Sequence, residues 1–167
     1  MVAHRPLTTK TERYPLPPDG PLMARLRVPD AMRLALGGGS EDSDQRRIKT
    51  LLDEMGLLWC HTPNEGKRDD RERGSALARG LKAGVPDALI YDPFDITIPD
   101  TGEVLHFVGL AFDLKVSTAT GCKVEDDQRR WGAGLRERGW MWEWPRGYLE
   151  ASKLIVAAYG QRSRGGR

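Results

Sequence analysis

The sequence predicts a mixed α/β fold, with a central sheet of about four strands flanked by helices. The length of 167 residues and the composition, 39% hydrophobic and 30% charged, suit one domain with a buried core. Apolar residues recur with helical spacing in residues 40–56 and 124–139. Short apolar runs bounded by glycine and proline occupy residues 56–63 and 85–93, as is typical of strands. Because helical and strand patterns alternate along the chain, they indicate an α/β layout.

Proline, glycine and charge divide the chain into three parts. We expect residues 1–39 to form a proline- and glycine-rich N-terminal extension, residues 40–160 the folded domain, and residues 161–167 a basic C-terminal tail. The extension has six Lys and Arg against three Asp and Glu, and the tail has three arginines. Basic ends can attract phosphate, although a charged end is more often only solvated. The net charge of +2 excludes a polycationic protein.

The composition also indicates the cellular compartment of the protein. No apolar run approaches the roughly 18 residues that span a bilayer, and the first residues lack the apolar stretch of a signal peptide. The two cysteines, Cys60 and Cys122, do not make a disulfide scaffold, and no Cys/His spacing matches a zinc site. We therefore expect a cytoplasmic protein with reduced thiols and no membrane contact.

The first helical segment has start and stop signals. Ser40 or Ser43 can cap its N-terminus, and Gly56 can end it. Extrapolated backward, its buried stripe reaches Asp44 and Glu41. An acid there could be a ligand, but an acidic first turn favoured by the helix dipole is the simpler interpretation. The stripe itself consists of Ile48, Leu51, Leu52 and Met55.

The remaining elements alternate between strands and helices. Residues 95–117 predict a hairpin with its turn at 99–102, and residues 140–144 predict a short aromatic strand. Helices are expected at 29–36, 75–84 and 147–160.

The run AFDLKVS, residues 111–117, has an acid and a base one residue apart in an otherwise apolar strand. Side chains alternate across a strand, so Asp113 and Lys115 point to the same face. Gly109 and Ala111 share that face and are small, which predicts space above it. The opposite face, expected to fill the core, consists of Val108, Leu110, Phe112, Leu114 and Val116.

These charges suggest a metal site. Burying both without partners would cost several kcal/mol per ion. Asp87 opens the preceding predicted strand and is the natural second carboxylate. Carboxylates from neighbouring strands can converge on Mg²⁺, which prefers oxygen ligands and retains several waters. A surface ion pair on an edge strand is the competing interpretation, and these residues alone favour neither.

An amide lies on the packed side of the second long helix. Val124, Gln128, Trp131 and Leu135 share one face, and a buried amide needs hydrogen-bond partners. The helix follows the strand of Lys115, so Gln128 can reach the same end of the sheet. An ordinary buried, hydrogen-bonded glutamine is the alternative.

Three tryptophans alternate on the predicted aromatic strand. Trp140, Trp142 and Trp144 therefore share one face. Stacking on nucleic-acid bases would use such a face, but packing against the sheet or a dimer contact is the favoured interpretation.

Five stretches form an ordered set of motifs: HTPNEGKR, LKAGVPDALIYDP, FVGLAFDLKVS, DDQRRWGAGLRERGW and RGYLEASKLIVAAYG. Together they resemble the VRR-NUC family of the PD-(D/E)XK nuclease superfamily. The similarity runs from about Glu41 to Tyr159 and leaves residues 1–39 uncovered. The family is frequent as small stand-alone proteins in bacteria and phages. The resemblance implies a restriction-endonuclease-like core.

The resemblance also implies roles, position by position. Asp87 of GVPD would be the first metal-binding carboxylate and Asp113 of DLK the second, with the Leu114 backbone carbonyl as a further ligand. Lys115 would be the catalytic lysine, and Gln128 the glutamine of the helix after the core. The family more often has Glu where this chain has Asp113, so the carboxylate here is one methylene shorter.

Four other positions match the family less directly. Glu41 matches its acidic helix position and could contact the metal, directly or through water. Asn64 and Glu65 match its NE loop, and His61 lies beside them as a supporting residue.

The function that this resemblance implies is hydrolysis of phosphodiesters by a Mg²⁺- or Mn²⁺-dependent deoxyribonuclease. The leading interpretation is a structure-selective endonuclease for branched DNA such as Holliday junctions. Expected partners are duplex or branched DNA, a second copy of the chain, and a helicase or other DNA-processing protein. The alternative is a non-catalytic nucleic-acid-binding or adaptor module on the same fold, with residues 1–39 as a docking segment. Candidate contacts to the nucleic-acid backbone are Lys67, Arg68, Lys82, Lys123, Arg129 and Arg130.

Overall fold

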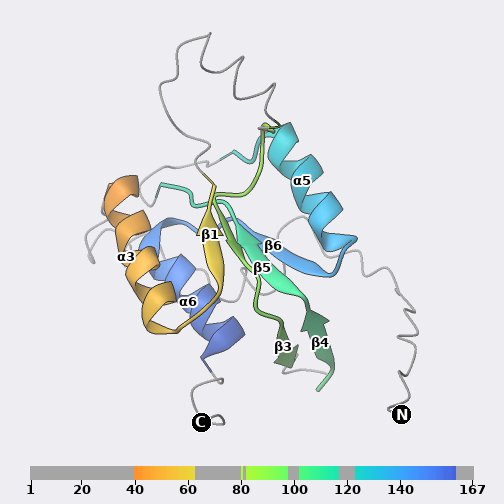
Figure 1. Cartoon of the computed structure of the whole chain (residues 1–167). Helices are drawn as coiled ribbons and strands as arrows, with labels where there is room; N and C mark the ends of the chain where they lie inside the picture. Colours follow the sequence, from red (N-terminus) through yellow and green to blue (C-terminus); the bar gives the residue numbers. More distant parts are fainter. Residues whose placement is uncertain (1–39, 63–79, 81, 98–101, 117–122, 161–167) are drawn as a thin grey trace.

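The computed structural model describes residues 40–62, 80, 82–97, 102–116 and 123–160, whose arrangement is shown in Figure 1. The helices among these residues are α3 (Glu41–Glu54), α5 (Asp126–Arg136) and α6 (Gly147–Tyr159). The strands are β1 (Trp59–His61), β2 (Ala88–Ile90), β3 (Phe94–Thr97), β4 (Val104–Phe107), β5 (Gly109–Phe112) and β6 (Trp140–Glu143). The predicted extension at 1–39 and the predicted tail at 161–167 lie outside the described residues.

The central sheet has four strands in the order β1-β2-β5-β6. β1 pairs with β2, and β2 with β5, in antiparallel fashion, whereas β5 and β6 are parallel. A parallel pair needs a crossover connection, and α5 lies in the connection between β5 and β6. The sheet is therefore mixed, and its four strands match the number that the sequence predicted.

Helices cover both faces of this sheet, with α3 and α6 on one side and α5 on the other (Figure 1). Leu110 and Phe112 of β5 belong to the large core cluster that includes Leu154 of α6. Ala111, between them, belongs to a second cluster with Leu135 of α5. Because side chains alternate across β5, one strand contributes to both cores. Each fully buried Leu or Phe contributes about 1.5–3 kcal/mol to folding.

Helix α3 begins and ends at the predicted signals. The Ser40 hydroxyl oxygen accepts a hydrogen bond of 3.2 Å from the backbone N–H of Ser43, so Ser40 is the N-cap. Gly56 follows the helix with φ of 65°, a left-handed conformation that glycine adopts without steric cost. Ile48 and Leu52 are buried on the face toward the sheet, which confirms the predicted stripe.

The prediction that the strand from 103 to 117 is continuous is wrong. β3 and β4 form a separate two-stranded sheet, and β5 begins at Gly109 in the central sheet. Val108 lies between the two strands and is 50% exposed, and Val116, beyond β5, is 38% exposed, so neither fills the core. A Cβ at Gly109 would lie 2.6 Å from both the Ile90 carbonyl oxygen and the Trp140 ring, so only glycine lets β5 begin at this point.

Other expectations fall mainly on residues outside the description. The hairpin turn at 99–102 is described only at Gly102, and the predicted helix at 29–36 is not described. Of the predicted helix at 75–84, the described residues, 80 and 82–84, are not helical. Among the described helices, none is both long enough and apolar enough to cross a membrane.

Candidate active site

Two aspartates lie opposite each other just beyond the paired ends of β2 and β5. β2 and β5 are antiparallel with Ala88 opposite Phe112, so Asp87 lies opposite Asp113 one position further along. Asp87 is 9% exposed and Asp113 is 0% exposed. An Asp87 carboxylate oxygen accepts a hydrogen bond of 2.8 Å from the backbone N–H of Leu114. The Asp87 side chain is thus tied directly to the D-L-K segment.

Both oxygens of the Asp113 carboxylate accept hydrogen bonds from side chains. Gln128 Nε2 donates to Oδ1 at 2.7 Å, and Trp142 Nε1 donates to Oδ2 at 2.8 Å. Burial raises the pKa of Asp113 above its ordinary value, while the Trp142 bond, the charge of Lys115 and the Gln128 bond act in the opposite direction. Since the folded-state pKa is raised, proton binding by Asp113 stabilises the folded state at low pH. That contribution is lost as the pH rises through the folded-state pKa.

The amide of Gln128 connects the acid to the lysine. Its Nε2 donates to Asp113, while its Oε1 accepts from Lys115 Nζ at 3.0 Å and from the backbone N–H of Glu125 at 3.1 Å. A reversed amide would turn its NH₂ toward two donors and its oxygen toward a carboxylate, so the partners determine its orientation. The bond from Glu125 is half of a capping box at the start of α5. The Gln128 side chain therefore both caps the start of α5 and connects Asp113 to Lys115.

The backbone of Lys115 is fixed by the chain that follows β6. Its N–H donates to the Pro145 carbonyl at 2.9 Å, and its carbonyl accepts from the Gly147 N–H at 2.8 Å. These bonds continue the parallel pairing of β5 and β6 beyond the strands, where Lys115 forms a bridge with Arg146. Lys115 therefore projects from a rigid backbone toward Gln128 and Asp113.

Glycine allows the segment before Asp87 to pack directly against α5. Gly84 has φ of 77°, and a Cβ there would lie 2.4 Å from the Asp127 carbonyl carbon and 2.6 Å from the Gln128 backbone nitrogen. Trp131 Nε1 also donates to the Ala83 carbonyl at 2.9 Å. The glycine of GVPD thus determines how close Gln128 lies to the acids.

Trp142 contacts the candidate site, whereas the sequence analysis favoured sheet packing or a dimer contact for it, with base stacking as the alternative. Its ring lies against the α5 backbone, since a Cβ at Gly132 would lie 2.0 Å from it. Arg136 stacks over the ring at 5.2 Å and donates to the Trp142 carbonyl at 3.2 Å. The sequence feature that could have indicated this contact is Gly132, a glycine inside α5 one turn after Gln128. The expected space above Gly109 and Ala111 is not there, because indoles fill it.

The donor chemistry of Asp87 and Asp113 fits a hard divalent cation. Mg²⁺ usually takes one or two carboxylates and completes its shell with waters and substrate phosphates. A cation would also offset the cost of the buried Asp113 charge. Each Asp113 oxygen has lone-pair capacity beyond the hydrogen bond it accepts. Within the described residues no three His, Cys, Asp or Glu side chains could share a metal ion, so Glu41 does not join the two acids.

The other predicted site residues lie at or outside the edge of this network. His61 Nδ1 donates to the Asp87 carbonyl at 2.8 Å, which joins β1 to the start of β2. Glu41 is the first residue of α3. Lys82, Lys123, Arg129 and Arg130 are exposed, and Arg130 forms an ion pair with Asp127. Asn64, Glu65, Lys67 and Arg68 lie outside the described residues.

The sheet order, the helices on both faces and the two aspartates opposite each other define a restriction-endonuclease-like α/β core. A solved structure titled "VRR_NUC domain protein" has this fold, with a TM-score of 0.54 and 18% identity over 74% of this chain and 90% of that chain. A second, titled "VRR_NUC domain", covers 69% of this chain and 92% of its own with 21% identity, and its TM-score of 0.41 is too low to support an argument. No family model and no curated protein matches the sequence. The likeness confirms the fold that the sequence resemblance implied.

Proposed function

We propose that the chain is a metal-dependent nuclease that hydrolyses phosphodiester bonds. The observation that supports this most directly is the hydrogen-bonded series Lys115–Gln128–Asp113, with Asp87 opposite Asp113 at the end of the β2–β5 pair. A surface ion pair does not need a partly buried amide to orient both partners. The fold of the solved VRR_NUC domain protein supports the same function. Within this function we propose a deoxyribonuclease that uses Mg²⁺ or Mn²⁺ and cleaves branched DNA endonucleolytically.

Each residue of the site has a distinct task in this reaction. Asp87 and Asp113 would hold the cation, with the Leu114 carbonyl as a further ligand. When bound, the cation would polarise the scissile phosphate and lower the pKa of an attacking water. Lys115 has three N–H donors, of which one bonds to Gln128. The others are available to orient the water or to stabilise the negative charge that develops on the phosphoryl oxygens.

Gln128 and Trp142 are positioning residues in this proposal. Gln128 holds the lysine and the acid in one geometry, and Trp142 fixes the second oxygen of Asp113. A displacement of about 1 Å in such a group can reduce the rate roughly a hundredfold. Rigid positioning also suits the shorter Asp113, because an aspartate has less reach than a glutamate.

Exposed basic residues near this end of the sheet would bind the DNA backbone. Lys82 precedes Asp87, and Lys123 and Arg129 flank the start of α5. Contacts of this kind hold the duplex and carry little sequence information. Binding that uses them should weaken steeply as salt concentration rises, with a slope near −0.9 per phosphate contact.

One observation favours a second candidate function. Asp113 is fully buried and both of its oxygens are hydrogen-bonded. A carboxylate that stays closed by these bonds does not bind a cation, and the chain would then be a non-catalytic nucleic-acid-binding or adaptor module on the same fold. Calorimetric titration with Mg²⁺ and Mn²⁺ separates the two functions, because the module would show no specific metal site.

The test of catalysis is a cleavage panel of labelled single-stranded, duplex, flap and four-way-junction DNA with Mg²⁺ or Mn²⁺. We expect junction or flap cleavage by the wild type and its loss in Asp87→Ala and Lys115→Ala. Lys153→Ala, an exposed lysine of α6, is the matched control. Equal cleavage by all four proteins would refute the assignment. Light scattering of the same samples tests the proposed homodimer, and a helicase partner can be tested by adding one to the reaction.

A further inference from the structure

A cavity of about 200 Å³ lies beside Asp87, between α3 and the sheet. Its apolar walls include Trp59 of β1 and Phe112 of β5, and its polar groups include Gln45 and His61. His61 donates to the Asp87 backbone carbonyl, and Asp87 itself lines the cavity, so the cavity lies beside one of the two proposed cation ligands. Pockets for drug-sized ligands are typically about 300–1,000 Å³, so this one suits a single small ring system.

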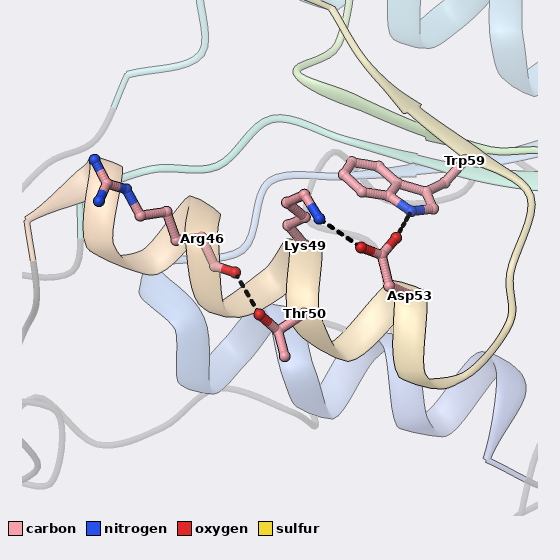
Figure 2. A network of polar contacts seen from close by, with 5 residues as sticks. All are labelled: Arg46, Lys49, Thr50, Asp53 and Trp59. Carbon is pink, nitrogen blue, oxygen red and sulfur yellow. Dashed lines mark hydrogen bonds and ion pairs between the residues drawn. The ribbon is translucent and has the colours of Figure 1, made fainter.

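The aromatic wall of this cavity is held in place by an ion pair. Figure 2 shows Lys49 and Trp59 approaching the carboxylate of Asp53 from two sides, with bonds of 2.6 Å from Lys49 Nζ and 2.9 Å from the indole N–H. The bond from Lys49, and then that from Trp59, lower the pKa of Asp53 below its ordinary value. Asp53 therefore remains an anion at neutral pH and fixes the orientation of the indole.

The charges around the cavity pair with one another. Arg46 forms an ion pair of 2.8 Å with Asp42, and Lys49 forms one of 2.6 Å with Asp53. Arg46, Asp42 and Lys49 all line the cavity. Because Arg46 and Lys49 are each paired with a carboxylate, the basic side chains around the cavity favour an uncharged ring over a phosphate. The Gln45 amide can donate to and accept from the edge of such a ring.

We propose that this cavity binds one unpaired nucleobase of the substrate, next to the phosphate that Asp87 addresses. The inference rests on the proposed function and specifies its substrate. An aromatic wall, an amide and a neutral rim suit a base, which stacks on aromatic side chains whatever its identity. A base inside a continuous duplex is stacked and paired, and removing it costs a few kcal/mol. The site therefore selects DNA with an unpaired nucleotide at the cleaved position, as in a flap or a junction.

The first test compares the binding of the wild-type protein to intact DNA and to DNA that lacks one base. The probe is a fluorescein-labelled duplex with a short single-stranded flap, compared with a series in which each flap nucleotide in turn is abasic. Binding is measured by anisotropy in EDTA, so that no cleavage is required. We expect one abasic position to weaken binding roughly ten- to hundredfold, the range for loss of one base–aromatic stack.

Three variants connect that effect to the cavity. Trp59→Leu should weaken binding of the intact flap by the same factor and remove the difference between intact and abasic DNA. Asp53→Ala, at an exposed position, releases the indole without removing it and should reduce the same difference several-fold. Trp140→Leu, a half-buried tryptophan of β6 that does not line the cavity, should leave the difference unchanged.

The outcomes separate the inference from the function on which it rests. Equal binding of intact and abasic flaps overturns the base-binding inference, even if the wild type cleaves them with Mg²⁺. A Trp59→Leu variant that retains the full wild-type difference between intact and abasic flaps also overturns it. Base-dependent binding without cleavage in any metal supports the inference and refutes the nuclease. Displacement of the intact flap by an apolar peptide, with no effect of abasic positions, would assign the cavity to a protein partner instead.

Discussion

Replacing Gln128 with methionine tests the centre of the proposed site. Methionine is unbranched, similar in length and a comparable helix former, so the backbone of α5 has no reason to change. The replacement removes an amide that makes three hydrogen bonds, to Asp113, Lys115 and the Glu125 N–H. It leaves Asp113 fully buried with the Trp142 bond as its remaining side-chain partner among the described residues.

The expected loss of stability follows from these three bonds. Hydrogen bonds to charged groups contribute about 1.5–3 kcal/mol and neutral ones about 0.5–1.5 kcal/mol. Lys115 is only partly buried and the capping bond is exposed, so their contributions fall at the low end or below. The free energy of unfolding should therefore drop by about 2–4 kcal/mol. For a protein of this size that lowers Tm by roughly 5–15 °C.

The assay combines thermal unfolding at neutral pH with steady-state cleavage of the preferred DNA. We expect kcat to fall about ten- to hundredfold while KM changes little, because the lost contacts orient reacting groups and do not bind substrate. Gln45→Met, the same chemical change at a half-buried glutamine of α3, is the control for unfolding. A Gln128→Met protein with wild-type Tm and wild-type kcat would refute the reasoning, because the network would then hold neither the fold nor the site.

Three further outcomes follow from the same network. Trp142→Phe removes one hydrogen-bond donor from the Asp113 carboxylate, which raises the pKa of Asp113 further. Since the proposed reaction needs the ionised carboxylate, the acidic limb of the pH profile of kcat/KM should move to higher pH. An acidic limb at the wild-type pH would contradict this. Gly84→Ala should lower both Tm and kcat, whereas Gly56→Ala, with a similar positive φ but nothing within 4 Å, should lower Tm alone and by less. Saturating Mg²⁺ at about a hundred times its Kd should raise Tm by roughly 5–10 °C, chelation with EDTA should reverse the shift, and Asp87→Asn should show none. An equal shift in Asp87→Asn would mean that the cation binds elsewhere.

Local patterns along the sequence predicted several elements correctly. The capping serine, the stripe at Ile48 and Leu52 and the terminating glycine determine α3, because all of them act within a few residues. The resemblance to a nuclease family added the overall fold, which the structural comparison confirms. The alternation of side chains put Asp113 and Lys115 on one face of a strand, and both residues contact Gln128 in the structure.

Other features depended on contacts between distant segments. The break between β4 and β5 lies where the Trp140 ring packs against Gly109, 31 positions away in the chain, and no local pattern contains that contact. The bond from Trp142 to Asp113 depends on the close approach of α5 to β6 at Gly132. Alternation predicted that the indoles share a face but could not predict which polar group they would meet.

The sequence by itself supplied the candidate side chains of the site, two acids, a lysine and an amide, and strand alternation placed Asp113 and Lys115 on one face. Only the tertiary structure decided that Gln128 bonds to both Asp113 and Lys115, that Trp142 holds the second carboxylate oxygen, and that a cavity lined by Trp59 opens beside Asp87. The physical reason is the range of the interactions. Helix caps and strand alternation act over a few residues, whereas the environment of a buried charge is set by whichever side chains the packing of helices and sheet brings within hydrogen-bond distance.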